Sequence, residues 1–364
     1  MNELKDYKEI IHKCSKCGLC QSVCPTYLET GNECVVSRGQ FIMLQGIIKG
    51  DLKMNKNINK YLDLCLKCGK CSGFCPSDID IVEIILSAKS EYFKHSVEGK
   101  LLSILQSKQI FNTALSIARF IFGRQKKFKK QFSKKAIYFG GCIETIYPKT
   151  SEYIKQLLNE MEIEVIDKKF NCCGLPFLTS GNINRFVEQV KENIEKIKDI
   201  EFDYFITDCA SCRWTWQEYV KYIDDEDLKH KLENIQFKSI YELILEYKLK
   251  FKTKQQCSIT YHQACHENKD IEKIISDIEN TNYIELEGKS ECCGFSALLK
   301  PSTWNITKNI FDKKKQNILK TNVDYVLTTC VGCVLSLSSI LAFKQKVVRV
   351  IDFLRTNCVS LRKK

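Results

Sequence analysis

The stretch FDYFITDCASC at residues 202–212 decides the fold, because it recurs as VDYVLTTCVGC at residues 323–333. In each copy a short run of β-branched and aromatic residues ends at a cysteine, and a C-x2-C pair begins there. Such a run is typical of a buried strand, and paired thiols at its end are typical of a metal site. The recurrence therefore predicts two copies of one metal-binding unit.

Two further motifs repeat with the same layout. They are AIYFGGC (136–142) with SITYHQAC (258–265), and FNCCG (170–174) with SECCG (290–294). The shift from Cys172 to Cys292 is 120 residues, and the shift from Cys209 to Cys330 is 121 residues. Residues 182–198 and 302–320 have apolar positions at helical spacing. We therefore expect two βαβ-type units with cysteines at the carboxyl ends of strands, where ligands usually bind in such folds.

The distribution of cysteines divides the chain further. We expect an α+β protein in which a helical, cysteine-bearing domain is followed by a duplicated α/β cysteine-rich domain. The predicted parts are the N-terminal domain at 1–84, a helical connector with a basic run at 85–135, a first cysteine-rich unit at 136–250 and a second at 251–364.

Composition limits the class of protein. The chain has 364 residues and 21 cysteines, and it is too large to need disulfides for its stability. Its start lacks the apolar stretch of a signal peptide, so we expect a cytoplasmic protein whose reduced thiols bind soft metals. The formal charge of +12 suggests a nucleic-acid or membrane partner. Thiolates bound to metal carry negative charge and would remove much of that excess, and we expect no nucleic-acid binding.

Eight of the first nine cysteines form two quartets, each followed by proline. The quartets are Cys14, Cys17, Cys20 and Cys24, and then Cys65, Cys68, Cys71 and Cys75. This C-x2-C-x2-C-x3-C-P run is the one that holds [4Fe–4S] clusters in bacterial ferredoxins, where the fourth cysteine ligates the other cluster. One cluster is therefore expected on Cys14, Cys17, Cys20 and Cys75, and a second on Cys24, Cys65, Cys68 and Cys71. Residues 1–84 are thus expected to form a ferredoxin-like, two-cluster [4Fe–4S] domain. Zinc fits poorly, because zinc sites use C-x2-C pairs that lie further apart. Cys34 is expected to be a buried structural thiol.

Each repeated unit offers five more thiols. They are Cys142, Cys172, Cys173, Cys209 and Cys212 in the first unit, and Cys265, Cys292, Cys293, Cys330 and Cys333 in the second. Adjacent cysteines can both face one metal only where the backbone bends, and Gly174 and Gly294 permit that bend. The C-x2-C pairs are expected at helix starts, which favour thiolate. A structural zinc or a redox dithiol is the alternative.

Together these motifs resemble the iron–sulfur proteins of the CCG-domain family over nearly the whole chain. That family includes the glycolate oxidase iron–sulfur subunit, heterodisulfide reductase subunits, a subunit of anaerobic glycerol-3-phosphate dehydrogenase and lactate-utilisation proteins. SRGQ (37–40) and YHQACH (261–266) are similar to two of its other elements. The resemblance implies one or two further iron–sulfur clusters, of the noncubane type, at the five-thiol sets.

The second unit departs from the family pattern. The interval from Cys265 to Cys292 is short for the family, and Cys257 is the alternative first ligand. His262 and His266 flank Cys265, and we expect them to surround the bound group rather than to ligate it.

The expected function is electron transfer. No G-x-G-x-x-G or P-loop pattern is present, so we expect no flavin of its own and predict no catalytic residue. The resemblance implies an FAD-containing partner subunit that oxidises a 2-hydroxy acid such as glycolate or lactate, with a quinone as a candidate acceptor. The alternatives are a heterodisulfide-reductase-like protein, in which a CCG cluster cleaves a disulfide, the corresponding subunit of an anaerobic glycerol-3-phosphate dehydrogenase, and a zinc-binding scaffold.

The connector has two interpretations. Residues 101–123 are amphipathic but too polar to span a membrane, and the basic run RQKKFKKQFSKK (124–135) follows them. The preferred interpretation is a helical linker that docks the two halves of the chain. The alternative is peripheral contact with an anionic membrane, at its inner face.

Overall fold

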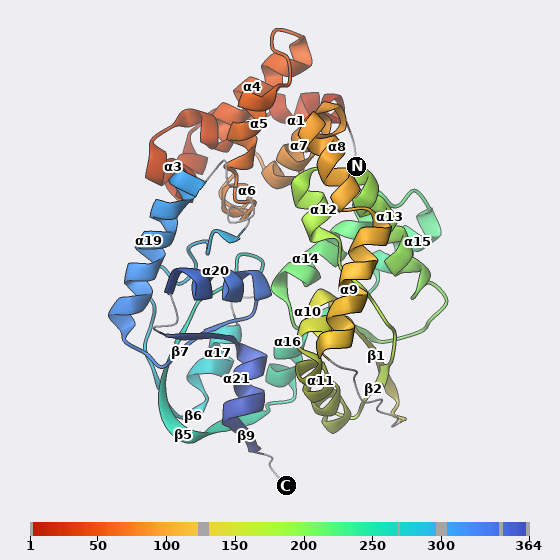
Figure 1. Cartoon of the computed structure of the whole chain (residues 1–364), viewed down its shortest axis with the longest axis vertical. Coiled ribbons are helices and arrows are strands. Elements are labelled where there is room, and N and C mark those ends of the chain that lie inside the picture. Colours follow the sequence, from red (N-terminus) through yellow and green to blue (C-terminus); the bar gives the residue numbers. More distant parts are fainter. Residues whose placement is uncertain (1–2, 123–130, 268–269, 296–303, 342–344, 362–364) are drawn as a thin grey trace.

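The chain has a helical N-terminal part and two α/β units. The structure is a computed structural model and describes residues 3–122, 131–267, 270–295, 304–341 and 345–361. In Figure 1 the N-terminal part lies at the top, and the first and second units lie below it, on the right and on the left. The expected fold class is confirmed.

The N-terminal part is built from short helices joined by cysteine-bearing loops. Its elements are η1 (Leu4–Tyr7), α1 (Lys8–His12), α2 (Leu19–Val23), α3 (Pro25–Thr30), η2 (Glu33–Val35), α4 (Ser37–Lys49), α5 (Lys56–Asp63), α6 (Lys70–Gly73) and α7 (Ile81–His95). Two of the α-helices have side-chain N-terminal caps: the Asn55 carboxamide accepts from the first turn of α5, and the Asp80 carboxylate accepts from the Glu83 amide in α7. Ile11, Phe41 and Leu62 are buried at the centre of this part.

The connector consists of α8 (Val97–Leu105) and α9 (Lys108–Phe122). One face of α9 docks on the first unit: Phe111 packs edge-to-face on Phe177 at 5.1 Å, and Arg119 donates to the Phe170 carbonyl at 2.9 Å. Large apolar side chains elsewhere on the two helices are exposed. They are Val97, Leu101, Ile104, Leu105, Ile110, Ile117, Phe120 and Ile121. Among the described residues, no helix is long and apolar enough to cross a membrane. Residues 123–130, which hold most of the basic run, lie outside the described residues.

The two α/β units share one topology. The first contains β1 (Lys134–Tyr138), α10 (Gly141–Ile146), α11 (Pro148–Glu160), β2 (Ile163–Ile166), α12 (Leu175–Ser180), α13 (Ile183–Glu195), β3 (Tyr204–Thr207), α14 (Ala210–Glu218), η3 (Tyr219–Tyr222), α15 (Glu226–Glu233), β4 (Phe237–Ser239) and α16 (Ile240–Glu246). The second contains β5 (Lys250–Tyr261), α17 (Ile271–Ser276), β6 (Glu279–Tyr283), α19 (Trp304–Thr321), β7 (Tyr325–Thr328), α20 (Val331–Leu341), β8 (Lys346–Arg349), α21 (Val350–Asn357) and β9 (Cys358–Leu361).

The strand orders confirm the internal repeat. Both sheets have four parallel strands, in the orders β2-β1-β3-β4 and β6-β5-β7-β8, and β9 pairs antiparallel with β5. If the strands of each unit are counted along the chain, both sheets therefore have the same order across the sheet: second, first, third, fourth. The two units also share apolar cores, one of which runs from Phe139 and Phe205 to Val326 and Leu337.

A buried ion pair joins the two units. The Arg349 guanidinium at the end of β8 donates to the Asp208 carboxylate at 2.6 Å, and their side chains are 1% and 0% exposed. Tyr138 donates its hydroxyl to the same carboxylate at 3.1 Å. Asp208 directly precedes Cys209, so this contact holds a cysteine loop of the first unit against the second unit.

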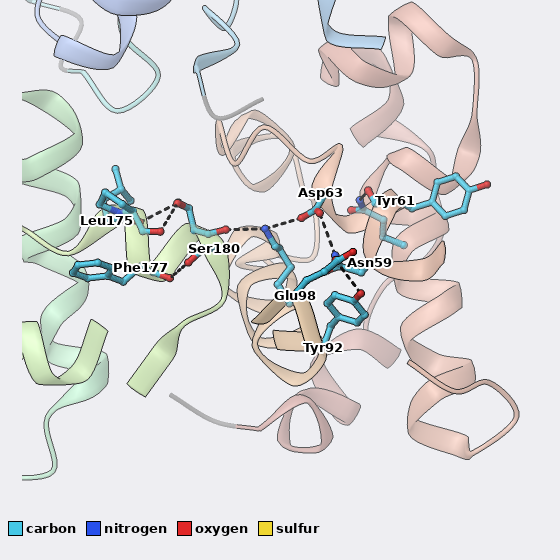
Figure 2. A network of polar contacts seen from close by, with 12 residues as sticks. Asn59, Tyr61, Asp63, Tyr92, Glu98, Leu175, Phe177 and Ser180 are labelled. Atoms are coloured by element: carbon cyan, nitrogen blue, oxygen red, sulfur yellow. Dashed lines mark hydrogen bonds and ion pairs between the residues drawn. The ribbon is translucent and has the colours of Figure 1, made fainter. Parts of the chain in front are cut away.

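Lys89 on α7 links the N-terminal part to the first unit. Its buried ammonium contacts the Asp63 carboxylate at 2.9 Å and donates to the Thr179 carbonyl at 2.7 Å. Figure 2 shows this network, in which Asp63 also accepts from Asn59 at 3.1 Å, while Ser180 lies at the end of α12. The ammonium has a charged and a neutral acceptor in two separate parts of the chain, so it fixes their relative positions.

Candidate metal centres

The first set of thiols comes from both ends of the N-terminal part. One cavity is lined by Cys14, Cys17, Cys20 and Cys75. Cys20 lies on α2, whose N-terminus follows Gly18 at φ +85°, a backbone conformation that favours glycine. The fold therefore brings Cys75 of the second quartet to the first three cysteines, as the ferredoxin-type pattern predicts. Their role as ligands stays a prediction.

The second set mirrors the first. A neighbouring cavity is lined by Cys24, Cys65, Cys68 and Cys71. Burial raises the pKa of the Cys24 thiol to about 11 and that of Cys68 to about 12. These thiols are therefore protonated at neutral pH in the absence of a cation, and metal binding would release their protons. Cys34 is half-buried and lines neither cavity.

In the first α/β unit, five thiols from three loops come together. Cys172 forms thiol contacts with Cys142 and Cys173, and Cys173 contacts Cys212 at the start of α14. The Gly174 amide donates to Cys172 Sγ at 3.4 Å. Hydrogen bonding from Cys142 raises the pKa of Cys172, whereas hydrogen bonding from Cys172 lowers that of Cys173. Cys209, the fifth thiol, contacts Cys212.

In each unit we call the five clustered thiols a cage. The cage of the second unit includes Cys265 and does not include Cys257. The five thiols form a chain of contacts: Cys265 with Cys292, Cys292 with Cys293, Cys293 with Cys333, and Cys333 with Cys330. Cys257 lies within β5, opposite Thr281 of β6. Of the two alternative first ligands, only Cys265 is therefore placed to bind.

Gly294 sets the bend of the second cage. It adopts φ +72°, and its amide donates to Cys292 Sγ at 3.3 Å. A Cβ at this position would lie 2.1 Å from the ring of Phe311. The glycine is therefore required both by its backbone conformation and by the packing around it.

The two expected histidines have different environments. His266 stacks on Trp214 with ring centroids 4.6 Å apart, and both rings line the cavity of the second cage. His262 is fully buried, and one of its ring nitrogens lies within 4.8 Å of the Cys293 and Cys333 sulfur atoms. Burial lowers the pKa of both imidazoles, so both are neutral at neutral pH.

The four cysteine sets adjoin one another in succession through the molecule. Cys71 lines both cavities of the N-terminal part. Cys68 and Leu66 pack against Cys292 and Cys265 of the second unit. Cys330 in turn contacts Cys209 of the first unit, and the Ser211 hydroxyl lies 3.2 Å from Cys330 Sγ.

The sequence did not predict the residues that lie where neighbouring cysteine sets adjoin. Lys67 is buried, adopts φ +54°, and lines both the second N-terminal cavity and the cavity of the second cage. Burial, together with nearby Lys89, lowers the pKa of Lys67 to about 7. The available signal was the recurrence of lysine in both quartets, as Lys16 and Lys67. Nothing in the sequence marked Ser211 or Trp214.

The donor set fits iron–sulfur groups. All 21 cysteines are free thiols. Thiolates around one tetrahedral zinc lie about 3.8 Å apart, given Zn–S bonds of about 2.3 Å. Within the described residues there is one set of three His, Cys, Asp or Glu donor atoms that lie within 4.8 Å of one another, and this set belongs to the second unit. Within the described residues, no three thiols of an N-terminal quartet lie within 4.8 Å of one another, as three ligands of one zinc ion would, and this favours a larger bound group.

Comparison with known proteins agrees with this organisation. The cysteine-rich domain CCG matches residues 136–217 and 259–338, and the 4Fe-4S dicluster domain matches residues 10–79. The probable glycolate oxidase iron-sulfur subunit of Bacillus subtilis is 22% identical, over 92% of this chain and 90% of the relative. A subunit of the dihydromethanophenazine:CoB–CoM heterodisulfide reductase of Methanosarcina acetivorans is 21% identical, over 89% of this chain and 87% of the relative.

One solved structure shows the same fold. The crystal structure of a hypothetical protein from Helicobacter pylori superimposes with a TM-score of 0.59. The match covers 97% of this chain and 75% of the other, at 11% sequence identity. At that identity the likeness concerns the fold alone.

Proposed function

Since this chain belongs to the iron–sulfur proteins that join a 4Fe-4S dicluster domain to two cysteine-rich CCG domains, we propose that it is the electron-transfer subunit of an oxidoreductase complex. The observation that carries the proposal is the succession of four adjoining cysteine sets. Iron–sulfur groups held there would supply one-electron transfer. The chain itself holds the sets in contact and, in the CCG units, buries most of the thiols away from water.

The proposed ligands follow the cavities. Cys14, Cys17, Cys20 and Cys75 would hold one [4Fe–4S] cluster, and Cys24, Cys65, Cys68 and Cys71 would hold the other. The five-thiol cages of the two units would hold one or two further groups. Iron and acid-labile sulfide analysis of the anaerobically purified chain tests this, with at least about eight iron atoms expected for two cubane clusters. Colourless protein with zinc and no sulfide would refute it.

We propose that the electrons come from a flavoprotein partner that oxidises a 2-hydroxy acid. The similarity to a probable glycolate oxidase iron–sulfur subunit supports this choice. The test mixes the oxidised chain with its flavoprotein partner and either glycolate or lactate, and follows bleaching of the cluster absorbance. Reduction is expected only when both partner and substrate are present. Failure of every 2-hydroxy acid, with reduction by glycerol 3-phosphate instead, would replace this substrate class.

Disulfide reduction is the second candidate, because the second cage opens to a cavity. Cys292, Cys293, Cys330 and Cys333 line a space of about 90 Å³ beside the Trp214–His266 stack. A disulfide takes up two electrons and two protons to give two thiols, so reoxidation of the reduced chain by added disulfide tests this candidate. Reoxidation lost in Cys293→Ala but kept in Cys257→Ala would favour it over the 2-hydroxy acid role.

We also propose that the exposed apolar face of α8 and α9 rests on an anionic membrane surface. Eight large apolar side chains are exposed on these helices, and the basic run 124–135 follows them in the sequence. Apolar burial combined with attraction of basic residues to anionic headgroups is the usual basis of peripheral binding. A purely docking linker, the interpretation preferred from the sequence, accounts only for the face of α9 that packs on the first unit.

A further inference from the structure

The two CCG cages differ at one structurally equivalent position. Phe139 directly follows the last residue of β1, and His262 directly follows the last residue of β5. The Phe139 amide donates to the Ile206 carbonyl at 2.8 Å, and the His262 amide donates to the Leu327 carbonyl at 2.8 Å. Ile206 and Leu327 are themselves 121 residues apart, which is the repeat shift. The fold therefore places an imidazole in the second unit where the first unit has a phenyl ring.

The surroundings of the two rings differ accordingly. Phe139 lies among aromatic rings, with centroids 5.1 Å from Phe170 and 5.2 Å from Trp216. His262 instead has a ring nitrogen within 4.8 Å of the Cys293 and Cys333 sulfur atoms. Both of those thiols belong to the cage, and within the described residues no other three donors of this kind lie so close together.

The imidazole lacks ordinary partners. Its side chain is 0% exposed, and among the described residues neither ring nitrogen makes a hydrogen bond of ordinary length and angle, although the Lys289 backbone lies near the ring. Burying an unsatisfied polar group costs about 1–3 kcal/mol, and native structures rarely contain one without a reason. A metal bound to the nitrogen would satisfy it, and imidazole with two thiolates is a common donor set for iron and zinc.

We propose that His262 is a metal ligand of the second unit, whose group is bound by an imidazole nitrogen in addition to thiolates. At the equivalent position of the first unit stands Phe139, whose phenyl ring cannot ligate a metal. The inference rests on the proposal that the CCG cysteines hold a metal group. The two cages are then chemically distinct, and the group nearer the dicluster domain carries the nitrogen ligand.

The sequence supplies the test variant. His262→Phe copies the residue of the first unit, and His230→Phe is the control, because it removes an exposed histidine of α15 that lines none of the cysteine cavities. The full chain is purified anaerobically and challenged with a chelator, and released iron and zinc are followed with time. His262→Phe is expected to release one fraction of its metal at least about tenfold faster than wild type, with His230→Phe unchanged. Equal release from wild type and His262→Phe overturns the proposal.

A second measurement uses the wild-type chain, so that the proposal can be tested even if His262→Phe does not fold. Wild-type chain labelled with ¹⁵N-histidine is reduced and studied by pulsed electron paramagnetic resonance, where a bound imidazole gives a nitrogen coupling to the metal. In a chain whose metal analysis finds iron and no zinc, absence of that coupling from every paramagnetic group overturns the proposal; where zinc is found, the chelator comparison decides. The variants Cys172→Ser and Cys293→Ser distinguish failure of the proposed function from failure of the His262 assignment. If neither variant loses metal, the CCG cages hold none and the proposed function fails. If Cys293→Ser loses metal and His262→Phe does not, only the role of His262 fails.

Discussion

Replacing Arg349 by methionine tests whether the ion pair between the CCG units holds them together. Arg349→Met keeps much of the side-chain volume but leaves the fully buried Asp208 carboxylate with the Tyr138 hydroxyl, 3.1 Å away. Removing one partner of a buried pair costs about 3–5 kcal/mol, because the other charge stays buried without compensation. We therefore expect the free energy of unfolding to fall by about that amount.

The assay is urea denaturation of the full chain under anaerobic conditions, followed by circular dichroism. With a slope of about 3 kcal/mol/M, the midpoint should fall by about 1–2 M. Lys229→Met is the matched control: Lys229 contacts Glu226 at the same distance of 2.6 Å, but the side chains are 31% and 82% exposed. An exposed pair contributes about 0.2–1 kcal/mol. A midpoint for Arg349→Met no lower than that of Lys229→Met would refute the reasoning.

The same variant has a pH dependence with a defined sign. Burial already raises the pKa of Asp208 above its usual value of 3.8, while Arg349 acts in the opposite direction. Without Arg349 the pKa rises further, so the folded state binds a proton more readily than the unfolded state does. The penalty of Arg349→Met is therefore full above the raised pKa and shrinks as the pH falls through it. A penalty independent of pH on the acid side would show that Asp208 is not the unpaired charge.

Three other predictions concern the cysteine sites and the connector. Cys75→Ser should lower the iron content by about one to four atoms per chain, because the fourth thiol of one cubane site is lost; unchanged iron measured by metal analysis would contradict this ligand assignment. Gly294→Ala should destabilise the chain by about 1–3 kcal/mol more than Gly31→Ala in urea denaturation, because both have positive φ but only Gly294 would bring a Cβ against a packed ring. Leu101→Glu should reduce co-sedimentation with vesicles containing phosphatidylglycerol, whereas Leu28→Glu, at a similarly exposed residue elsewhere, should not; wild-type chain that fails to sediment with such vesicles would refute membrane contact.

The local parts of the candidate sites were predictable because they depend on spacing along the chain. Cysteines three residues apart share one loop, and a cysteine after a β-rich run lies at a strand end. For the same reason the recurrence of YFITDC as YVLTTC was sufficient to predict two related units, which the strand orders confirm. The exposed face of the connector was harder to predict, because amphipathic spacing does not indicate which apolar side chains find a partner.

The sequence by itself determined the cysteine motifs, the internal repeat and the ferredoxin-type and CCG relationships, since all of these are encoded in residue identity at fixed intervals. Only the tertiary structure decided that Cys265 rather than Cys257 joins the second cage, since β5 carries Cys257 into the sheet. It also decided that the second unit, later in the chain, meets the dicluster domain at Cys68 and Cys292, and that Cys209 meets Cys330. These contacts join residues more than a hundred positions apart, and they follow from how apolar faces pack rather than from any local pattern.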